Sequence, residues 1–172
     1  MARRIVLAAC LAVLASVAVT QSAQSGLTTK LMNADGKPIG TVTLTQTPHG
    51  VLVEIDASGL KPGEHGLHFH ETGRCDPETG FKSAGGHFAP AGRQHGYLDE
   101  KGYHAGDMPN QFVAQDGRLR AHVFNPNVTL SGGKAALRDA DGSALVIHSG
   151  ADDYRSQPSG DSGDRIACAV IR

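Results

Sequence analysis

The sequence predicts an all-β fold of about eight short strands in a two-sheet or barrel-like arrangement, and three observations favour it. Glycine accounts for 22 of 172 residues, about twice its usual share of roughly 7%. Tryptophan is absent and aromatic residues make up only 5% of the chain, so large rings contribute little to the core. Segments of alternating polar and apolar residues recur between turn residues, with hardly any helical period.

The individual strands are identified by period-two alternation and by the turns that bound them. Thr41–Thr45 alternates polar and apolar residues, and Val51–Asp56 repeats the pattern after the turn residues Pro48-His49-Gly50. Asp116-Gly117 forms a similar turn further along the chain. In chain order the expected strands are Leu27–Asn33, Thr41–Thr45, Val51–Asp56, His65–Glu71, Gln111–Gln115, Arg118–Val123, Ala144–Ser149 and Ile166–Ile171.

Two long segments, Glu71–Met108 and Gly150–Asp164, lack periodicity and are rich in Gly, Pro, Asp and Ser. Irregular loops of this length inside a compact domain are usually functional. Since no repeat or second domain is visible, we expect residues 24–172 to form a single domain that carries two long functional loops.

Residues 1–23 have the layout of a secretory signal peptide. A basic head, Met1–Arg4, precedes the apolar run Ile5–Val19, and cleavage is expected near Ala18 or Ala23. The run of about 15 residues is short for a membrane span of roughly 20 residues. We therefore expect no stable span after processing, with an uncleaved anchor as the alternative. The periplasm is the expected location, and secretion or lipid anchoring are the other options.

Export changes how the three cysteines are interpreted. Cys10 lies within the signal, which leaves Cys75 and Cys168 in the mature chain. Two cysteines in an oxidising compartment predict one disulfide, and two separate buried thiols are the alternative.

The charge balance excludes one class of partner. The formal net charge is −1, and loss of Arg3 and Arg4 with the signal makes the mature chain more negative. Such a chain offers no basic field to a polyanion, so we expect no nucleic-acid binding.

Histidines carry the strongest functional signal. His68 and His70 flank Phe69 in an expected strand, where side chains alternate between faces, so both imidazoles point the same way and can converge on one metal ion. His148 ends another expected strand and could supply a third nitrogen. A half-exposed strand also produces the H-x-H pattern by chance, so this motif alone is a moderate signal.

The first long loop adds His87, His95, His104 and Asp107. Three nitrogens and one carboxylate oxygen make a set that can close a tetrahedral zinc site. Metal ligation would also order a glycine-rich loop that lacks strands. The remaining histidines, His49, His65 and His122, are not expected to be ligands. His49 lies in a turn, His65 could be a structural hydrogen-bonding residue, and His122 is expected to face solvent.

Together these residues resemble the copper/zinc superoxide dismutases, and in particular their bacterial, exported branch. The likeness runs from about Leu31 to the C-terminus, with the motifs in the family's order and spacing. They are His65-Gly66-Leu67-His68-Phe69-His70, Gly86-His87-Phe88, His95, His104-Ala105-Gly106-Asp107, His148 and Gly160–Cys168. The resemblance implies an eight-stranded Greek-key β-sandwich or barrel, and an enzyme that dismutes superoxide to dioxygen and hydrogen peroxide in antioxidant defence.

The resemblance further implies one copper ion and one zinc ion per chain. Copper would be bound by His68, His70, His87 and His148, and zinc by His87, His95, His104 and Asp107, so that His87 joins the two ions. Arg165 would orient the superoxide anion over the open face of copper, and His87 and Arg165 would be the catalytic residues. Asp152 would link a copper histidine to a zinc histidine. Cys75 and Cys168 would form the family's intrasubunit disulfide.

Three other classes of metal-binding protein would use some of the same residues. A copper- or zinc-binding trafficking or storage protein would use the same ligands but give Arg165 no role. A cupin-type oxygenase also begins with H-x-H, but its glutamate lies a few residues after the second histidine, and Glu71 is too close. A mononuclear zinc hydratase would leave His95, His104 and Asp107 unused. The expected strand faces carry no obvious apolar stripe, so the oligomeric state stays open and includes a homodimer.

Overall fold

The computed structural model describes residues 26–172, and the predicted signal peptide lies outside the described residues. Eight antiparallel strands and two short 3-10 helices make up the regular structure of this part of the chain. The strands are β1 (Gly26–Asn33), β2 (Pro38–Thr47), β3 (Gly50–Ala57), β4 (Gly63–His70), β5 (Asp107–Val113), β6 (Leu119–Asn125), β7 (Ser143–His148) and β8 (Arg165–Ile171). The short helices are η1 (Pro77–Thr79) and η2 (Lys82–Ala84).

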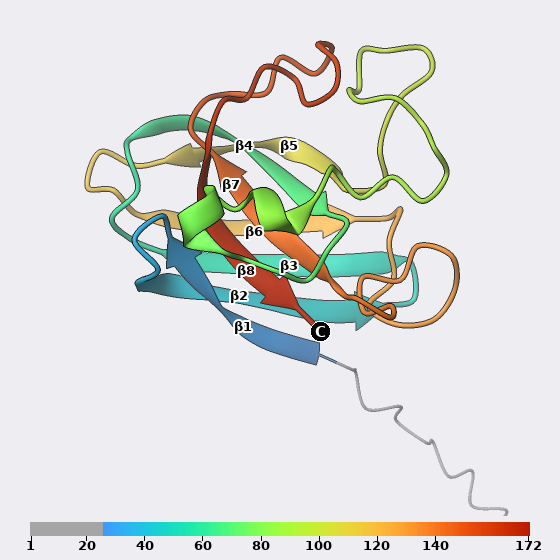
Figure 1. The fold of residues 1–172 in the computed structure, drawn as a ribbon, viewed down its shortest axis with the longest axis horizontal. Helices are drawn as coiled ribbons and strands as arrows, with labels where there is room; N and C mark the ends of the chain where they lie inside the picture. The colour runs from blue at the N-terminus through green and yellow to red at the C-terminus, as the bar shows by residue number, and fades with distance from the viewer. Residues whose placement is uncertain (1–25) are drawn as a thin grey trace, which may run out of the picture.

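The strands form one sheet in the order β5-β4-β7-β8-β1-β2-β3-β6, and β5 also contacts β6, so the sheet curls into a nearly closed barrel (Figure 1). The connections from β3 to β4 and from β6 to β7 join strands that are not neighbours in the sheet. This is the Greek-key pattern that the resemblance implied, and the all-β prediction is confirmed.

Alternation along the strands separates an inner from an outer face. Leu67 and Phe69 on β4 join the main apolar cluster together with Leu145 and Ile147 of β7, and all are at most 1% exposed. His68 and His70 alternate with them and therefore lie on the outer face, opposite Val146 and Ala144 in the β4–β7 register. The prediction that both imidazoles share a face away from Phe69 is confirmed.

The first long loop covers this outer face. Phe81 and Ala84 of the loop pack with Ala144, Val146 and Cys168 in a second apolar cluster. The Cys75–Cys168 disulfide, which is formed as predicted, ties the same loop to β8. The loop is therefore held over the histidines of β4 by apolar packing and by one covalent bond.

The second long loop, residues 149–164, lies beside the first at one end of the barrel (Figure 1). The Leu98 amide donates to the carbonyl oxygen of Tyr154 at 3.0 Å, and the His95 amide donates to Gln157 Oε1 at 3.0 Å. A third irregular segment, residues 126–142, joins β6 to β7 and was not predicted. Its Val128, Leu130 and Leu137 add to the main core. Among residues 26–172, no helix has the length and hydropathy that a membrane span requires.

Candidate metal centre

The two loops and the outer face of the barrel bring the predicted ligands into one buried cluster. His68, His70 and His95 are 0% exposed, His148 and Asp107 are 3% and 2% exposed, and His87 and His104 are each 9% exposed. Such a concentration of polar side chains is costly to bury unless the groups satisfy one another or bind an ion. The structure therefore brings all seven predicted ligands together in one buried cluster.

Four histidines form the first group. One ring nitrogen each of His68, His70, His87 and His148 lies within 4.8 Å of the others. His70 Nε2 and His148 Nε2 are 3.4 Å apart. On their far sides, His70 Nδ1 lies 3.0 Å from the Gly85 carbonyl oxygen and His148 Nδ1 lies 3.3 Å from that of Gly163. These carbonyls can accept only from a protonated Nδ1, which leaves the two Nε2 lone pairs facing each other.

Asp107 is the centre of the second group. Its Oδ1 lies 3.1 Å from His87 Nδ1 and 3.2 Å from His104 Nδ1, and its Oδ2 lies 3.1 Å from His95 Nδ1. The atoms that lie within 4.8 Å of one another belong to His68, His87, His95 and Asp107. His104 joins this group through Asp107 and through His87, whose Nδ1 is 3.4 Å from its own. The carboxylate is thus surrounded by three imidazole nitrogens.

Asp152 lies behind both groups. Its Oδ2 is 2.7 Å from His68 Nε2, its Oδ1 is 3.0 Å from His95 Nε2, and the carboxylate is 3% exposed. The Tyr154 amide also donates to Oδ1 at 2.6 Å. A carboxylate behind a ring nitrogen fixes which nitrogen carries the proton and directs the other forward.

Three buried ring nitrogens of the described residues have no hydrogen-bond partner. Among the described residues, the buried side-chain atoms without a hydrogen-bond partner are His68 Nδ1, His87 Nε2 and His95 Nδ1. An unpartnered buried polar atom is costly, and each such atom needs an explanation. All three point into the two groups, so metal ions bound there would satisfy them. The residues present therefore fit a pair of metal ions.

The electrostatics of the two groups differ. Burial lowers the pKa of His87 to about 4 and that of His148 to about 3. Burial also lowers the pKa of His68 and places that of His70 well below its usual value. The four-histidine group is therefore neutral near pH 7, which is the form that binds metal ions.

His95 behaves in the opposite way. Burial disfavours its charged form, but the carboxylates of Asp107 and Asp152 on either side of the ring outweigh burial and raise its pKa to about 9. Burial likewise opposes ionisation of both carboxylates, yet hydrogen bonds from the neighbouring histidines hold the pKa of each well below its usual range. Asp107 in the second group and Asp152 behind both groups therefore carry the negative charge of the centre.

Arg165 lies at the edge of the first group. Its Nη1 donates to the Phe81 carbonyl oxygen at 2.8 Å, and its Nη2 donates to that of Gly85 at 2.7 Å. The Gly85 oxygen also accepts from His70, so guanidinium and imidazole meet at one atom. Its positive charge lowers the pKa of His70 and of His148, and it therefore acts on the four-histidine group.

The other histidines behave as predicted. His49 and His122 are exposed, and His122 lies 3.5 Å from Glu54 on the barrel surface. His65 is buried, with ring nitrogens 2.7 Å from the carbonyl oxygens of Lys61 and His148, so it is a structural hydrogen-bonding residue behind a predicted ligand. The sequence interpretation gave no role to Gly85, and it named Gly160 only as the start of a motif. Neither glycine carries a chemical signal, since the role of each lies in the backbone that it permits.

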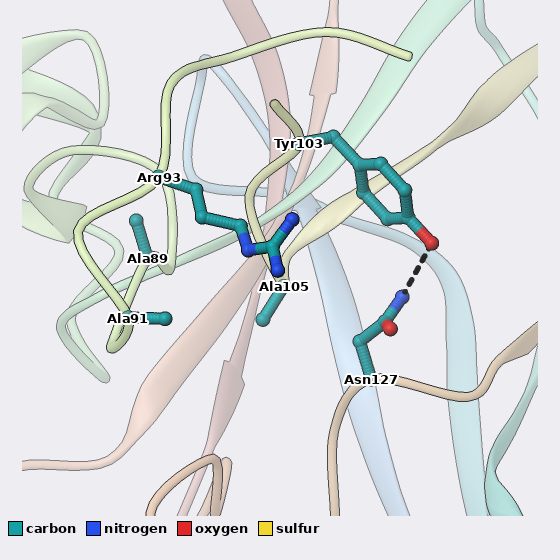
Figure 2. A pocket seen from close by; sticks show the side chains of 6 residues that line it. All are labelled: Ala89, Ala91, Arg93, Tyr103, Ala105 and Asn127. Carbon is teal, nitrogen blue, oxygen red and sulfur yellow. Dashed lines mark hydrogen bonds between the residues drawn. The ribbon is translucent and has the colours of Figure 1, made fainter. Parts of the chain in front are cut away.

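A surface pocket of about 370 Å³ lies on the outer side of the first loop (Figure 2). It is lined by Ala89, Ala91, Arg93, Tyr103, Ala105 and Asn127, none of which is a predicted ligand. Asn127 donates to the Tyr103 hydroxyl at 3.2 Å, and Arg93 donates to the Gly102 carbonyl oxygen at 3.0 Å. The first contact connects the loop to the β6–β7 segment, and the second joins two parts of the loop.

The barrel and its cluster are those of a metalloprotein with two adjacent groups of side chains that could each hold an ion. A family model described as copper/zinc superoxide dismutase (SODC) matches residues 38–171. The chain belongs to the copper/zinc superoxide dismutase family. It is accordingly an oxidoreductase that acts on superoxide and takes copper and zinc as cofactors.

Individual relatives agree with this assignment. A Cu-Zn superoxide dismutase of Aquifex aeolicus is 52% identical over 145 residues, which cover 83% of this chain and 84% of the relative. The Cu-Zn superoxide dismutase of Caulobacter vibrioides is 48% identical over 141 residues, with 80% of each chain covered. Both relatives are bacterial.

Solved structures with the same fold include two bacterial proteins. A superoxide-dismutase-like protein from Bacillus subtilis is 39% identical with a TM-score of 0.82, and the match covers 87% of this chain and 100% of that one. The Cu/Zn superoxide dismutase from Brucella abortus is 29% identical with a TM-score of 0.70, and the match covers 86% of this chain and 100% of that one.

Proposed function

We propose that this chain dismutes superoxide to dioxygen and hydrogen peroxide at a centre of one copper and one zinc ion that are joined by His87. The proposal rests on the different surroundings of the two ring nitrogens of His87. His87 Nδ1 lies 3.1 Å from Asp107 in the second group, whereas Nε2 has no hydrogen-bond partner and belongs to the four-histidine group. An imidazole that has lost both ring protons can bind one ion through each nitrogen.

Copper is assigned to His68 Nδ1, His70 Nε2, His87 Nε2 and His148 Nε2. The support is that the second nitrogen of each of the other three rings is already engaged, by Asp152, by Gly85 and by Gly163 respectively. Each ring can therefore offer one lone pair inward. Nitrogen ligands in a tetragonal arrangement favour Cu(II).

Zinc is assigned to the Nδ1 atoms of His87, His95 and His104 and to Asp107 Oδ1. Three nitrogens and one carboxylate oxygen suit tetrahedral zinc, and the negative charge of Asp107 favours a divalent ion. His68 approaches this group too. Its Nε2 is engaged by Asp152, however, so it has one nitrogen to give, and we assign that nitrogen to copper.

Copper, when bound, supplies a one-electron redox couple, whereas zinc does not change its charge. The protein's own groups have two tasks. The half-buried Arg165 guanidinium, held by Phe81 and Gly85, orients the incoming anion and offsets its charge. His87 Nε2 is a buried nitrogen without a hydrogen-bond partner, at which a proton can be held and then passed to the peroxide product.

We further propose that residues 24–172 are the mature, single-domain enzyme and that it is exported, with the periplasm as its compartment. The basic and apolar pattern of residues 1–23 supports export, as does a disulfide of the kind found in oxidising compartments. N-terminal sequencing of the processed protein and cell fractionation test this part. An uncleaved N-terminus on a cytoplasmic protein would contradict it.

The main test is metal content together with superoxide consumption of the purified mature protein. We expect one copper and one zinc per chain and fast, cyanide-sensitive activity. A zinc-only, inactive protein would contradict the proposal.

Variants at Arg165 separate catalysis from metal storage. Arg165→Ala should cut superoxide turnover about tenfold or more while copper affinity stays within about twofold, because the guanidinium touches no assigned ligand nitrogen. Arg165→Lys should fall between the two, since it keeps the charge but loses the two-pronged anchoring. An unchanged rate in Arg165→Ala would favour a trafficking or storage protein.

A further inference from the structure

Three side chains meet at one peptide unit, the unit between Gly85 and Gly86. Its carbonyl oxygen accepts from Arg165 Nη2 at 2.7 Å and lies 3.0 Å from His70 Nδ1. Its N–H, which belongs to Gly86, donates to Glu71 Oε1 at 2.9 Å. A carboxylate on one side of the peptide is therefore connected to a guanidinium and an imidazole on the other.

A peptide unit transmits polarisation between its two ends. A hydrogen bond from N–H to a carboxylate is stronger than one to a neutral acceptor, and it increases the negative charge on the carbonyl oxygen. The Gly85 oxygen thus becomes a better acceptor for both His70 and Arg165. The arrangement resembles the carboxylate–histidine pair found behind many metal ligands, with a peptide inserted between carboxylate and ring.

The local backbone is built around this carboxylate. Glu71 follows His70 directly, and its own amide donates to the Gly86 carbonyl oxygen at 3.0 Å, so residues 71 and 86 are joined by main chain and side chain together. Gly85 has φ +76°, and a Cβ there would lie 2.6 Å from Glu71 Cγ and Oε1. Glycine at this position therefore makes room for the carboxylate.

Charge supports the same connection. Burial lowers the pKa of Arg165, and the one charged group that opposes this effect is Glu71. The exposed carboxylate thus acts on the guanidinium in addition to holding the peptide that anchors it.

We propose that Glu71 is a positioning residue that fixes the orientation of His70 and Arg165 through the Gly85–Gly86 peptide unit. The proposal rests on the assignment of His70 and Arg165 to the copper site. Glu71 acts through this peptide unit, which its side chain holds, and through its charge on Arg165.

Three variants separate its contributions. Glu71→Ala removes both the acceptor and the charge, whereas Glu71→Gln removes the charge and keeps an oxygen that can accept from the Gly86 N–H. Glu64→Gln is the matched control, because Glu64 is an exposed glutamate on β4, the strand that Glu71 directly follows, and has no side-chain hydrogen bond among those of the described residues. Circular dichroism and thermal melting establish that each variant is folded.

The first measurement uses the metal-free protein and does not depend on enzymatic activity. NMR follows exchange with water of the His70 Nδ1–H proton and of the Gly86 amide. We expect exchange of both to be about tenfold or more faster in Glu71→Ala and about three- to tenfold faster in Glu71→Gln, because a hydrogen bond to a charged acceptor is stronger than one to a neutral acceptor. Exchange in Glu64→Gln should match wild type. If Glu71→Ala matches wild type, the proposal is wrong. If Glu71→Ala does not fold, the proposal is tested by Glu71→Gln, in which both protons must then exchange faster than in Glu64→Gln.

The second measurement uses the metal-loaded enzyme. Both Glu71 variants lose the same negative charge, so their ionic-strength dependence of superoxide turnover should shift equally. Positioning should then lower turnover of Glu71→Ala about three- to tenfold below that of Glu71→Gln. Equal turnover of the two variants would overturn the positioning role. Altered proton exchange in a protein that has no superoxide activity would instead contradict the proposed function and leave the peptide connection standing.

Discussion

Replacement of Asp152 by asparagine tests how the two groups are connected. The carboxylate accepts from His68 Nε2 at 2.7 Å through one oxygen, and from His95 Nε2 at 3.0 Å and the Tyr154 amide at 2.6 Å through the other. Asparagine has nearly the same shape, but one of its oxygens is replaced by an NH₂ group that donates. It cannot accept from both rings, and it carries no charge.

The expected loss of metal affinity follows from the number of hydrogen bonds that asparagine cannot accept. One hydrogen bond to a charged group is lost, which costs about 1.5–3 kcal/mol, or roughly 10- to 150-fold in affinity. We expect the zinc site to bear most of this loss. His95 depends on Asp152 to hold its proton at Nε2 and direct Nδ1 forward, whereas the copper group keeps two rings that are fixed by the carbonyls of Gly85 and Gly163. Losing the partner behind a ligand typically weakens metal binding 10- to 100-fold.

Zinc and copper affinities of the metal-free protein can be measured by competition with a chromophoric chelator. The matched control is Asp153→Asn, because Asp153 is the neighbouring exposed carboxylate and bonds only to residues 155 and 156 within its own loop. Asp152→Asn should lose at least tenfold in zinc affinity and less in copper affinity, and Asp153→Asn should lose neither. An unchanged zinc affinity in Asp152→Asn, or an equal loss in the control, would refute the connecting role.

Three further predictions concern protons, the disulfide and one glycine. Because the pKa of His95 is about 9, zinc must displace a proton from this ring at pH 7. Zinc affinity should therefore rise about tenfold per pH unit up to pH 9, while copper affinity stays nearly flat. Competition titrations across that range check this, and a zinc affinity that does not change with pH would contradict it. Cys75→Ser should lower the free energy of unfolding by about 4 kcal/mol and the Tm by roughly 10 °C, because the disulfide with Cys168 closes a long loop. Calorimetry checks this, and the wild-type protein with its disulfide reduced should melt at the same temperature as the variant. Gly160→Ala should destabilise the metal-free protein by about 1–3 kcal/mol in denaturant unfolding and should weaken zinc binding. The reason is that φ at this position is +69° and that the new Cβ would lie 2.6 Å from His95 Nε2. If the variant is as stable as wild type, the site relaxes around the added methyl group and the reasoning is wrong.

Alternation along the chain predicted β2 and β3, in which buried residues alternate with more exposed ones. β4 and β7 are buried over most or all of their length, and they were predicted as well. Thr41–Thr45 and Val51–Asp56 lie within β2 and β3, and the missing residues at each end are those where alternation gives no signal. The fifth strand was placed too late, because β5 begins at Asp107 with two consecutive buried residues. The pairing of β4 with β5 shifts register between His65 and Leu67, and such an irregularity breaks the period-two pattern at a place that the sequence cannot reveal.

The candidate ligands could be picked out from the sequence because histidine and aspartate are conspicuous and because strand alternation fixes the direction of His68 and His70. Their supporting contacts were not. Gly85 and Gly163 act through carbonyl oxygens, which every residue has, and Gly160 acts by having no side chain against Asp152. Glu71 is an ordinary exposed glutamate until the loop folds back and brings the Gly86 amide to it. Such roles are set by backbone geometry, so residue type alone does not indicate them.

The difference in charge across His87 supplies a reason for two different ions in one cluster. On its Nε2 side lie rings whose pKa values are lowered by burial, so that group offers neutral nitrogens and no charge. On its Nδ1 side lie Asp107 and His95, where a carboxylate stays ionised and a proton must leave before a metal binds. The first set suits a copper ion, which prefers nitrogen and cycles in charge, and the second suits a zinc ion of fixed charge. Exchanging the two ions would place copper, in both of its charge states, beside the fixed negative charge of Asp107. If ions occupied both groups, the ion at Nδ1 would hold the His87 ring in place while Nε2 takes up and releases the proton that the proposal assigns to it.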